Sequence, residues 1–129
     1  NVADAIAAYL NVKVPAPQAV DTLRKLARSA GVSLDTAIAA LERRLGLIER
    51  HGVSLARATF AAQFGRNMEY YTGFVFEFRT PAVPAPLAGG GRYDNLLTAL
   101  GAPKPAPAVG LALFGERALA ARRTQGGAA

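Results

Sequence analysis

The sequence predicts an α+β fold in which an antiparallel sheet has flanking helices. Apolar residues within positions 1–52 recur three or four residues apart, which is typical of amphipathic helices. Later segments alternate apolar and polar residues, as half-buried strands do. The links between these segments are hairpin-like, whereas parallel strands need helical crossovers. We therefore expect helices first and an antiparallel sheet after them.

The composition is that of one globular domain and excludes several kinds of site. Of the 129 residues, 51% are hydrophobic and 19% are charged, which argues against disorder. The absence of cysteine excludes disulfides, thiolate zinc sites and cysteine nucleophiles. His51 is the sole histidine and follows the basic end of a helix, where a solvated or capping role is favoured. We expect no metal ion, no cofactor and no catalytic role for His51.

The sequence also bears on the location of the protein and on its binding partners. No segment approaches the roughly 18 apolar residues of a membrane span, and no signal-peptide pattern opens the chain, so we expect a cytoplasmic protein without a membrane partner. The net charge of +6 comes from scattered basic residues, which favours solvated helix faces over a nucleic-acid surface. Because the chain opens at Asn1 within a helical pattern, we expect a piece of a longer protein.

Three helices are predicted in the first half. An alanine-rich helix spans 2–10, and the prolines at 15 and 17 interrupt the pattern. A second helix begins at Gln18 and stops at Gly31, a residue type common just past helix ends. Ser33 is expected to cap a third helix, which carries an apolar stripe and runs to about His51.

Strands and short helices are predicted in the second half. We expect strands over 55–64, 70–79 and 108–114, a short helix over about 93–100 and a last helix over 115–123. The prolines at 81, 84 and 86 predict an irregular connection. The expected organisation is a helical segment over 1–52, a second segment over 53–123 and a tail over 124–129.

The strand alternation assigns two faces. In 70–79, the face with Phe74, Phe76 and Phe78 is expected to be core, and the face with Tyr71 and Glu77 is expected to leave room above the sheet. In 108–114, Ala108, Gly110 and Ala112 leave one face nearly bare, while Val109, Leu111 and Leu113 are expected to face the core. A bare face before a helix suits a ligand, and close packing of another element is the alternative.

The segment 89–94, Gly-Gly-Gly-Arg-Tyr-Asp, is the most distinctive local pattern. Glycines without Cβ atoms permit positive φ angles and close approach of the backbone to a ligand. The segment lacks the spacing of a P-loop and of a dinucleotide-binding fingerprint. A flexible turn is the alternative interpretation.

The segment 66–73 brings a guanidinium, a carboxylate and two phenols close together in sequence. Arginine offers a planar fork for carboxylate or phosphate, and tyrosine offers stacking and a hydroxyl. A hairpin with a surface Arg66–Glu69 pair is the alternative.

Taken in order, three segments resemble the histidyl-tRNA synthetase family. That family carries Arg-Gly-Leu-Asp-Tyr-Tyr, then Gly-Gly-Gly-Arg-Tyr-Asp, then a glycine-rich strand ending in Glu-Arg, and here these correspond to 66–71, 89–94 and 110–117. The resemblance covers about 53–123, and the preceding helices are similar to the end of the family's helical insertion. It implies part of a class II aminoacyl-tRNA synthetase-like catalytic domain.

The resemblance implies a histidine site and, beside it, a nucleotide side. The residues implied for histidine are Arg66, Glu69, Tyr70, Tyr71, Gly89, Gly90, Gly91 and Tyr93. Among them, Arg66 would lie near the amino-acid carboxylate and Tyr71 and Tyr93 would bracket the imidazole. The residues implied for the nucleotide side are Gly110, Ala112, Phe114 and Arg117.

Departures from the synthetase pattern point to a non-catalytic branch. Phe114 stands where synthetases have glycine, and its ring would occupy space that a nucleotide needs. Asn67, Met68 and Glu69 replace Gly-Leu-Asp, and the chain ends soon after the third segment, before an anticodon-binding domain. With these departures, the sequence resembles the regulatory subunits of ATP phosphoribosyltransferase.

That resemblance implies regulation of the first step of histidine biosynthesis, with no catalytic residues. The implied partners are the short-form catalytic subunit, L-histidine as feedback ligand and a second copy in a dimer. The alternative is a fragment of a histidyl-tRNA synthetase that activates histidine with ATP.

Overall fold

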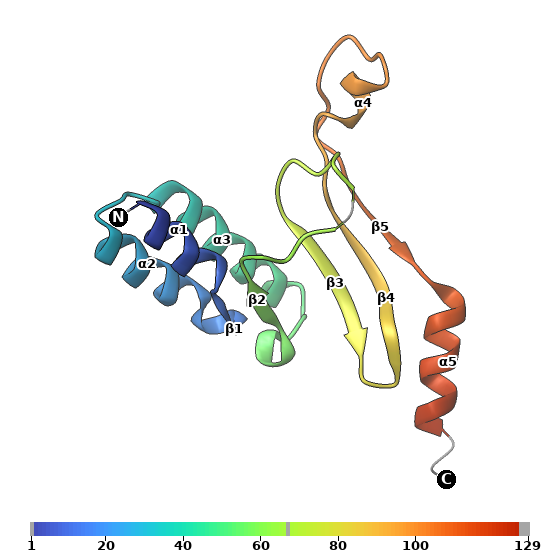
Figure 1. Ribbon diagram of the computed structural model, residues 1–129. Coiled ribbons are helices and arrows are strands. Elements are labelled where there is room, and N and C mark those ends of the chain that lie inside the picture. The colour runs from blue at the N-terminus through green and yellow to red at the C-terminus, as the bar shows by residue number, and fades with distance from the viewer. Residues whose placement is uncertain (1, 67, 127–129) are drawn as a thin grey trace. The chain divides into compact units, whose positions relative to one another are not determined.

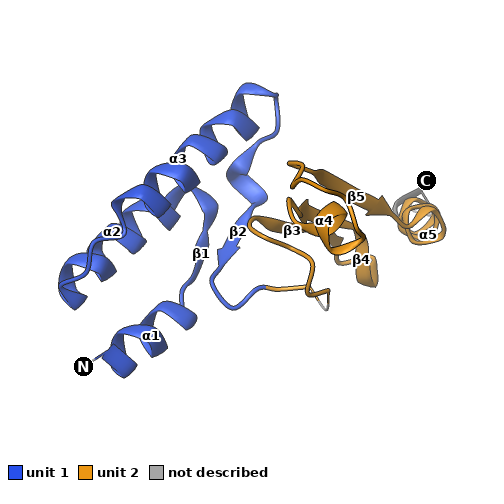
Figure 2. Ribbon diagram, turned by 90° about the horizontal axis from the view of Figure 1, so that it is seen from above, with its two compact units in different colours: residues 1–64 blue, residues 65–129 orange. Residues whose placement is uncertain are grey.

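The computed structural model describes residues 2–66 and 68–126, which form two compact units over residues 1–64 and 65–129 (Figure 2). We call them the helical unit and the sheet unit. The predicted α+β class with antiparallel sheets is confirmed, because every strand pair in the described chain is antiparallel. The domain boundaries expected from the sequence remain a prediction.

The helical unit contains three α-helices and a short two-stranded ladder (Figure 1). Its helices are α1 (Val2–Leu10), α2 (Ala19–Ala30) and α3 (Asp35–Arg50). The chain leaves α2 through Gly31 at φ 65°, the left-handed conformation that glycine adopts without strain. The strands β1 (Lys13–Pro15) and β2 (Thr59–Ala61) pair antiparallel.

The core of the helical unit lies where α2 meets α3. Burial follows the periodicity of the sequence, since each helix turns one apolar stripe toward the other. The buried residues are Ala19, Val20, Leu23, Ala27, Ile38 and Leu41, and the partly buried residues packed on them are Val12, Val14, Leu45 and Phe60.

Two sequence predictions are wrong in this unit. Ser33 does not cap α3: its hydroxyl donates to the Asp35 carboxylate over 3.0 Å, and Leu34 occupies the N-cap position. The strand expected over 55–64 shrinks to β2, because Ser54 caps a 3-10 turn at Leu55–Arg57. Leu55 is buried, so this turn serves the helical unit's packing, and β2 pairs back to β1.

The sheet unit contains a three-stranded antiparallel sheet in the order β3-β4-β5. Its elements are β3 (Val75–Thr80), β4 (Val83–Arg92), α4 (Leu96–Ala99), β5 (Val109–Leu113) and α5 (Gly115–Gly126). The predicted strand over 70–79 and helix over 93–100 are thus shorter than expected. Residues 72–74 still bond to the end of β4, through Thr72 N–H to the Arg92 carbonyl and Arg92 N–H to the Phe74 carbonyl, both over 2.9 Å.

The central strand contradicts the predicted irregular connection, and it also contradicts the alternative interpretation of the glycines as a flexible turn. β4 includes Pro84, Pro86 and all three glycines at 89–91. The prolines are tolerated because the register between β3 and β4 shifts near the hairpin, between Phe78 and Thr80, and regular pairing begins at Ala88. Among the described residues, positive φ occurs at Gly31, Gly52 and Gly101, so none of the three strand glycines uses it.

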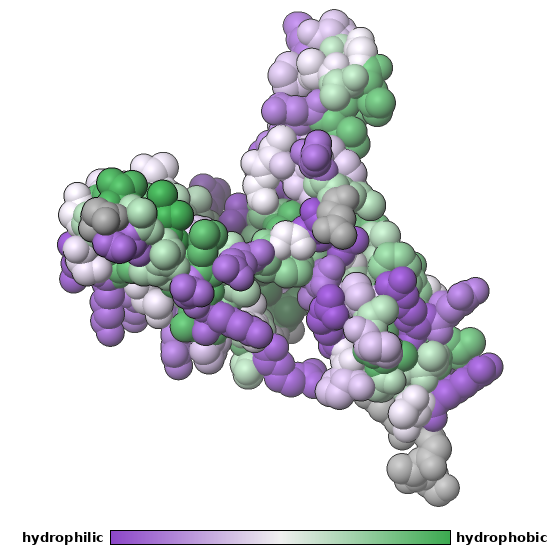
Figure 3. Space-filling view, in the orientation of Figure 1, coloured by the Kyte–Doolittle hydropathy of each residue, from purple (hydrophilic) through white to green (hydrophobic). Residues whose placement is uncertain are grey.

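One face of the sheet is apolar and open, contrary to the prediction that it is core. Phe78, Val109, Leu111 and Leu113 are 54%, 76%, 61% and 67% exposed. The Phe74, Phe76 and Phe78 rings follow one another along this face at centroid distances of 5.9 and 5.7 Å. Alternation correctly groups these side chains on one face, but Phe74 and Phe76 are only half-buried and the other four are exposed. Figure 3 also shows apolar surface at the α4 tip, where Leu97 and Leu100 are exposed.

Truncation of a core leucine tests the helix packing. We expect Leu23→Ala to lower the free energy of unfolding of the helical unit by about 2–5 kcal/mol. The Leu23 side chain is only 6% exposed, so its truncation leaves a cavity in the core. Leu47→Ala, at a position 39% exposed on α3, is the matched control and should cost under about 1 kcal/mol. Urea unfolding followed by circular dichroism measures both, and equal losses would contradict the assigned core.

Candidate functional site

The candidate site lies on one face of the three-stranded sheet. The register pairs Val75 with Gly91 and Gly91 with Gly110, and it pairs Glu77 with Gly89 and Gly89 with Ala112. Residues directly opposite one another share a face. We call this side the glycine face, and it carries Gly89, Gly91, Gly110 and Ala112.

Large side chains of the same unit lie directly on this face, in the space that glycine leaves. A Cβ atom on Gly89 would overlap the Arg66 guanidinium, and one on Gly110 would overlap the Tyr93 hydroxyl. On Gly91 it would stand 2.8 Å from the Tyr71 ring and 2.5 Å from the Phe74 carbonyl oxygen. The missing Cβ atoms therefore admit one arginine and two tyrosines of the chain itself.

Gly90 serves another purpose, because it points to the opposite face. Its register partners are Phe76 and Leu111, and a Cβ atom there would meet the backbone of β5, with the Leu111 Cα 2.8 Å away. Glycine at this position lets β4 and β5 approach closely.

Three tyrosines form an aromatic cluster above the glycine face. The ring centroids of Tyr70 and Tyr71 are 4.6 Å apart, those of Tyr70 and Tyr93 are 5.4 Å apart and those of Tyr71 and Tyr93 are 6.2 Å apart. The hydrogen bond with Tyr71 raises the pKa of Tyr70, and desolvation adds to this effect. Tyr70 therefore keeps its hydroxyl protonated at neutral pH, and the three rings together offer flat surfaces and hydroxyl groups.

A buried ion pair borders the tyrosines. Arg66 Nη1 lies 3.1 Å from Glu77 Oε1, and the two side chains are only 11% and 13% exposed. The second Glu77 oxygen accepts from Arg79 Nε over 2.9 Å. The Arg66 Nε is buried and has no hydrogen-bond partner among the residues that the structure describes. Arg66 thus carries a donor that no group of the described chain satisfies, and a buried donor is costly when left unpaired.

The Arg92-Tyr93-Asp94 segment fixes Tyr93 by bonds on both sides. Arg92 Nε donates to Asp94 Oδ2 over 2.7 Å, and the Ala108 N–H donates to Asp94 Oδ1 over 3.1 Å. The Tyr93 N–H donates to the Ala108 carbonyl over 2.8 Å. The bond from Arg92 lowers the pKa of Asp94; desolvation opposes this shift and the Ala108 amide adds to it. Asp94 therefore stays ionised and holds the loop before β5 against the end of β4.

Two of the residues that the resemblance implies for the nucleotide side, Phe114 and Arg117, contact each other and β4. The Arg117 Cζ lies 3.9 Å from the centroid of the Phe114 ring, a cation–π geometry. Arg117 Nη1 donates to the Pro86 carbonyl over 2.8 Å. The Phe114 N–H donates to the Leu87 carbonyl over 2.9 Å. This guanidinium is directed at β4 and at Phe114.

The structure brings together most of the residues expected from the sequence. Those gathered on the glycine face are Arg66, Tyr70, Tyr71, Gly89, Gly91, Tyr93, Gly110 and Ala112. Gly90 points to the other face, and Glu69 is exposed in the turn before the cluster. Asn67 lies outside the described residues. Sequence reasoning missed Glu77 as a site residue, although the alternation had placed it on the Tyr71 face.

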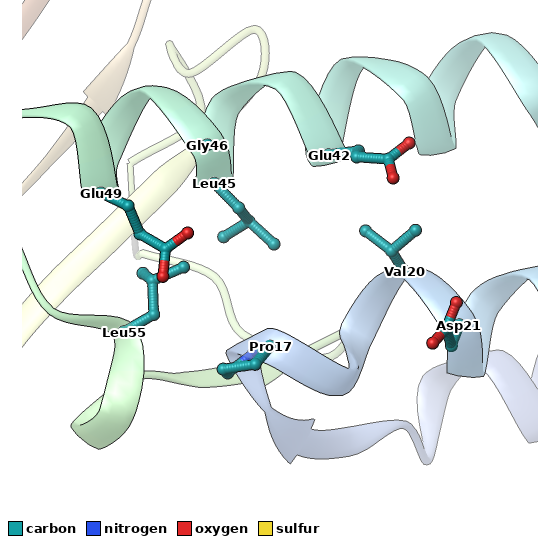
Figure 4. A pocket seen from close by; sticks show the side chains of 8 residues that line it. All are labelled: Pro17, Val20, Asp21, Glu42, Leu45, Gly46, Glu49 and Leu55. Atoms are coloured by element: carbon teal, nitrogen blue, oxygen red, sulfur yellow. The ribbon is translucent and has the colours of Figure 1, made fainter.

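A separate hollow in the helical unit has a volume of about 350 Å³ (Figure 4). Its lining includes the apolar residues Val20, Leu45 and Leu55 and the acidic residues Asp21, Glu42 and Glu49. Glu42 is already engaged, since Arg24 Nη2 lies 2.7 Å from its Oε2.

In the described chain, no group of three or more His, Cys, Asp or Glu side chains is placed to hold a metal ion. No helix among the described residues is long and apolar enough for a membrane span.

Comparison with known proteins places this chain in a family. A profile described as histidyl-tRNA synthetase matches residues 1–117. The chain belongs to the histidyl-tRNA synthetase family. The matched range includes the glycine face, the tyrosine cluster and Arg117.

Similar relatives of the chain are named as ATP phosphoribosyltransferase regulatory subunits. Over 114 residues, the chain is 43% identical to an ATP phosphoribosyltransferase regulatory subunit from Chelativorans sp. (strain BNC1) and 44% identical to one from Agrobacterium fabrum. These matches cover 88% of this chain and 31% and 30% of the relatives. The chain thus spans about a third of the length of these relatives.

Two solved structures resemble the chain. A protein from Bacillus halodurans, described as an ATP phosphoribosyltransferase regulatory subunit/histidyl-tRNA synthetase, matches with a TM-score of 0.71 and 27% identity over 92% of this chain and 29% of its own. A histidine–tRNA ligase subunit from Alicyclobacillus acidocaldarius matches with a TM-score of 0.60 and 39% identity over 80% of this chain and 31% of its own.

Alanine substitutions test how closely other atoms approach each glycine of this histidyl-tRNA synthetase-like sheet. Gly90→Ala and Gly91→Ala should destabilise the sheet unit more than Gly89→Ala and Gly110→Ala, because the first two meet backbone atoms and the others meet the ends of side chains. We expect about 1–3 kcal/mol for Gly89→Ala and Gly110→Ala and larger losses for the other two. Gly73→Ala, whose nearest neighbour is 3.9 Å away, is the control. Urea unfolding measures the series, and uniform losses would contradict the argument.

The depressed pKa of Asp94 predicts a pH dependence. A carboxyl with a lowered pKa stabilises the fold above its ordinary value of 3.8, and this contribution is lost as the pH falls through the lower native value. Asp94→Asn should therefore lower Tm at pH 7, and its difference from the parent should shrink below about pH 4. Thermal unfolding across this range is the measurement. Asp21→Asn, a carboxylate 78% exposed, should change Tm little at any pH, and a pH-independent loss in Asp94→Asn would refute the assignment.

Proposed function

We propose that this chain is the histidine-sensing part of an ATP phosphoribosyltransferase regulatory subunit. In this role it binds L-histidine and controls a short-form catalytic subunit in the first step of histidine biosynthesis, in the cytoplasm and as a dimer. It performs no chemistry itself. The similarity to two regulatory subunits at 43% and 44% identity supports this proposal.

The engagement of Arg117 is the structural observation that carries the proposal. A nucleotide-binding relative needs an arginine free to meet phosphates and an open space beside the strand before it. Here the Arg117 guanidinium stacks on Phe114 and donates to the Pro86 carbonyl. The side chains that suit an amino acid are the three rings and Arg66, whose buried Nε has no partner among the described residues. Binding without activation is the behaviour that this arrangement favours.

The mechanism is a coupling between ligand and partner. Histidine would place its carboxylate at Arg66 and its imidazole among Tyr70, Tyr71 and Tyr93, where flat rings and hydroxyl donors meet it. A ligand shifts a conformational equilibrium by its difference in affinity between two states. The complex of regulatory and catalytic subunits would therefore move toward its inhibited state when histidine binds.

A second candidate is histidine activation by a synthetase. The histidine–tRNA ligase subunit from Alicyclobacillus acidocaldarius, 39% identical, favours it. ATP–pyrophosphate exchange dependent on histidine in the full-length protein would support this candidate and overturn the regulatory proposal.

Aromatic truncations test the histidine site. In the full-length protein, Tyr71→Ala and Tyr93→Ala should each weaken histidine binding about tenfold or more, since each removes a ring that covers the glycine face. Titration calorimetry with L-histidine is the measurement. Tyr9→Ala, on α1 in the other compact unit, is the control and should leave the Kd unchanged. Unchanged affinity in both site variants would remove these rings from the site.

A further inference from the structure

Glu77 stands outside the motifs that carry the family resemblance, yet it contacts Arg66, to which the proposed function assigns the ligand carboxylate. We propose that Glu77 is the positioning residue of this site: its carboxylate fixes the Arg66 guanidinium on Gly89, so that Arg66 meets the carboxylate of a bound amino acid. This inference rests on the proposed histidine-binding function, which it deepens.

The contacts place Arg66 between a backbone and a carboxylate. Glu77 and Gly89 are cross-strand partners, and a Cβ atom on Gly89 would lie 3.2 Å from the Glu77 Cγ. Arg66 lies in the same space, with Nη1 3.1 Å from Glu77 Oε1. Because glycine admits the guanidinium on one side and Glu77 holds it on the other, the long side chain loses most of its freedom. Such fixation lowers the entropy cost of meeting a ligand.

The Glu77 carboxylate is itself held by a second arginine. Arg79 reaches Glu77 Oε2 through Nε over 2.9 Å and through Nη2 over 2.8 Å, and it also donates to the Pro84 carbonyl over 3.3 Å. Each oxygen of the carboxylate is thus committed to one arginine. Two guanidiniums share one carboxylate, so the group keeps one net positive charge, which suits an anionic ligand.

The position of Arg66 sets the class of ligand. Arg66 lies on Gly89 and Tyr71 lies on Gly91, two residues along β4, which separates their footprints by about 7 Å. A molecule with a carboxylate near a flat ring matches both groups, as an aromatic or heteroaromatic α-amino acid does. A simple anion would use Arg66 alone and gain nothing from the tyrosine cluster.

Two probes separate positioning from a general loss of structure. L-histidine carries the carboxylate, and histidinol replaces it with a hydroxymethyl group while keeping the amine and imidazole. In the full-length protein, Glu77→Gln should weaken L-histidine binding at least about tenfold and change histidinol binding less than about twofold. Glu116→Gln, an exposed carboxylate in the same unit, is the control and should alter neither.

A second variant covers the case in which Glu77→Gln does not fold, since removal of one partner leaves a buried charge. Glu77→Asp keeps the charge, but it is one methylene shorter and cannot reach both arginines, so it should weaken L-histidine binding selectively by a smaller factor. Unchanged or tighter L-histidine binding in these variants, or an equal loss for histidinol, would overturn the proposal.

The Arg66 Nε–H signal in an NMR spectrum tests positioning without any ligand. In the parent protein it should exchange slowly with water, because Arg66 is 11% exposed, and in the Glu77 variants exchange should accelerate at least about tenfold. If the parent binds neither L-histidine nor histidinol, the proposed function fails, while this signal still decides whether Glu77 fixes Arg66. Equal exchange rates in parent and variants would overturn the positioning role.

Discussion

The candidate site depends on three glycines, which leave part of one face of the sheet without side chains. Gly89, Gly91 and Gly110 present bare backbone on one face, and Arg66, Tyr71 and Tyr93 fill the space that they leave. Glycine within a strand costs conformational entropy and contributes no packing of its own. The sheet accepts this cost because the filling side chains come from elsewhere in the same unit. They bury the glycines and are themselves oriented by them.

Ion pairs and backbone hydrogen bonds at both ends of the glycine face complete this arrangement. Glu77 holds Arg66 at one end, and the Arg92–Asp94 pair with the Ala108 amide holds Tyr93 at the other. The groups that would meet a ligand are thus set before it arrives, which is how a small site reaches useful affinity.

The helices could be predicted from the sequence because their signals are local. The stripe from Val20 to Ala27 and the glycine at 31 specify α2 without knowledge of any partner. The strands could not be predicted as fully. Gly89, Gly90 and Gly91 have the local character of a turn, and pairing with β3 and β5, which is not local, makes them the central strand. Likewise alternation groups Val109, Leu111 and Leu113 on one face but does not tell whether anything covers that face.

Short motifs in the sequence mark most residues of the candidate site, but they do not mark Glu77. A charged residue in an alternating strand has the pattern of a solvent-facing position, and only the fold brings Arg66 over it. The same reasoning separates the two arginines of the unit. Arg66 keeps a buried Nε without a partner in the described chain, whereas Arg117 is engaged by Phe114 and by the Pro86 carbonyl. Both guanidiniums are thus held by groups of the chain itself, and under the proposed function the unpaired Nε of Arg66 is the feature that suits an amino acid, whereas the contacts of Arg117 leave it poorly suited to a nucleotide.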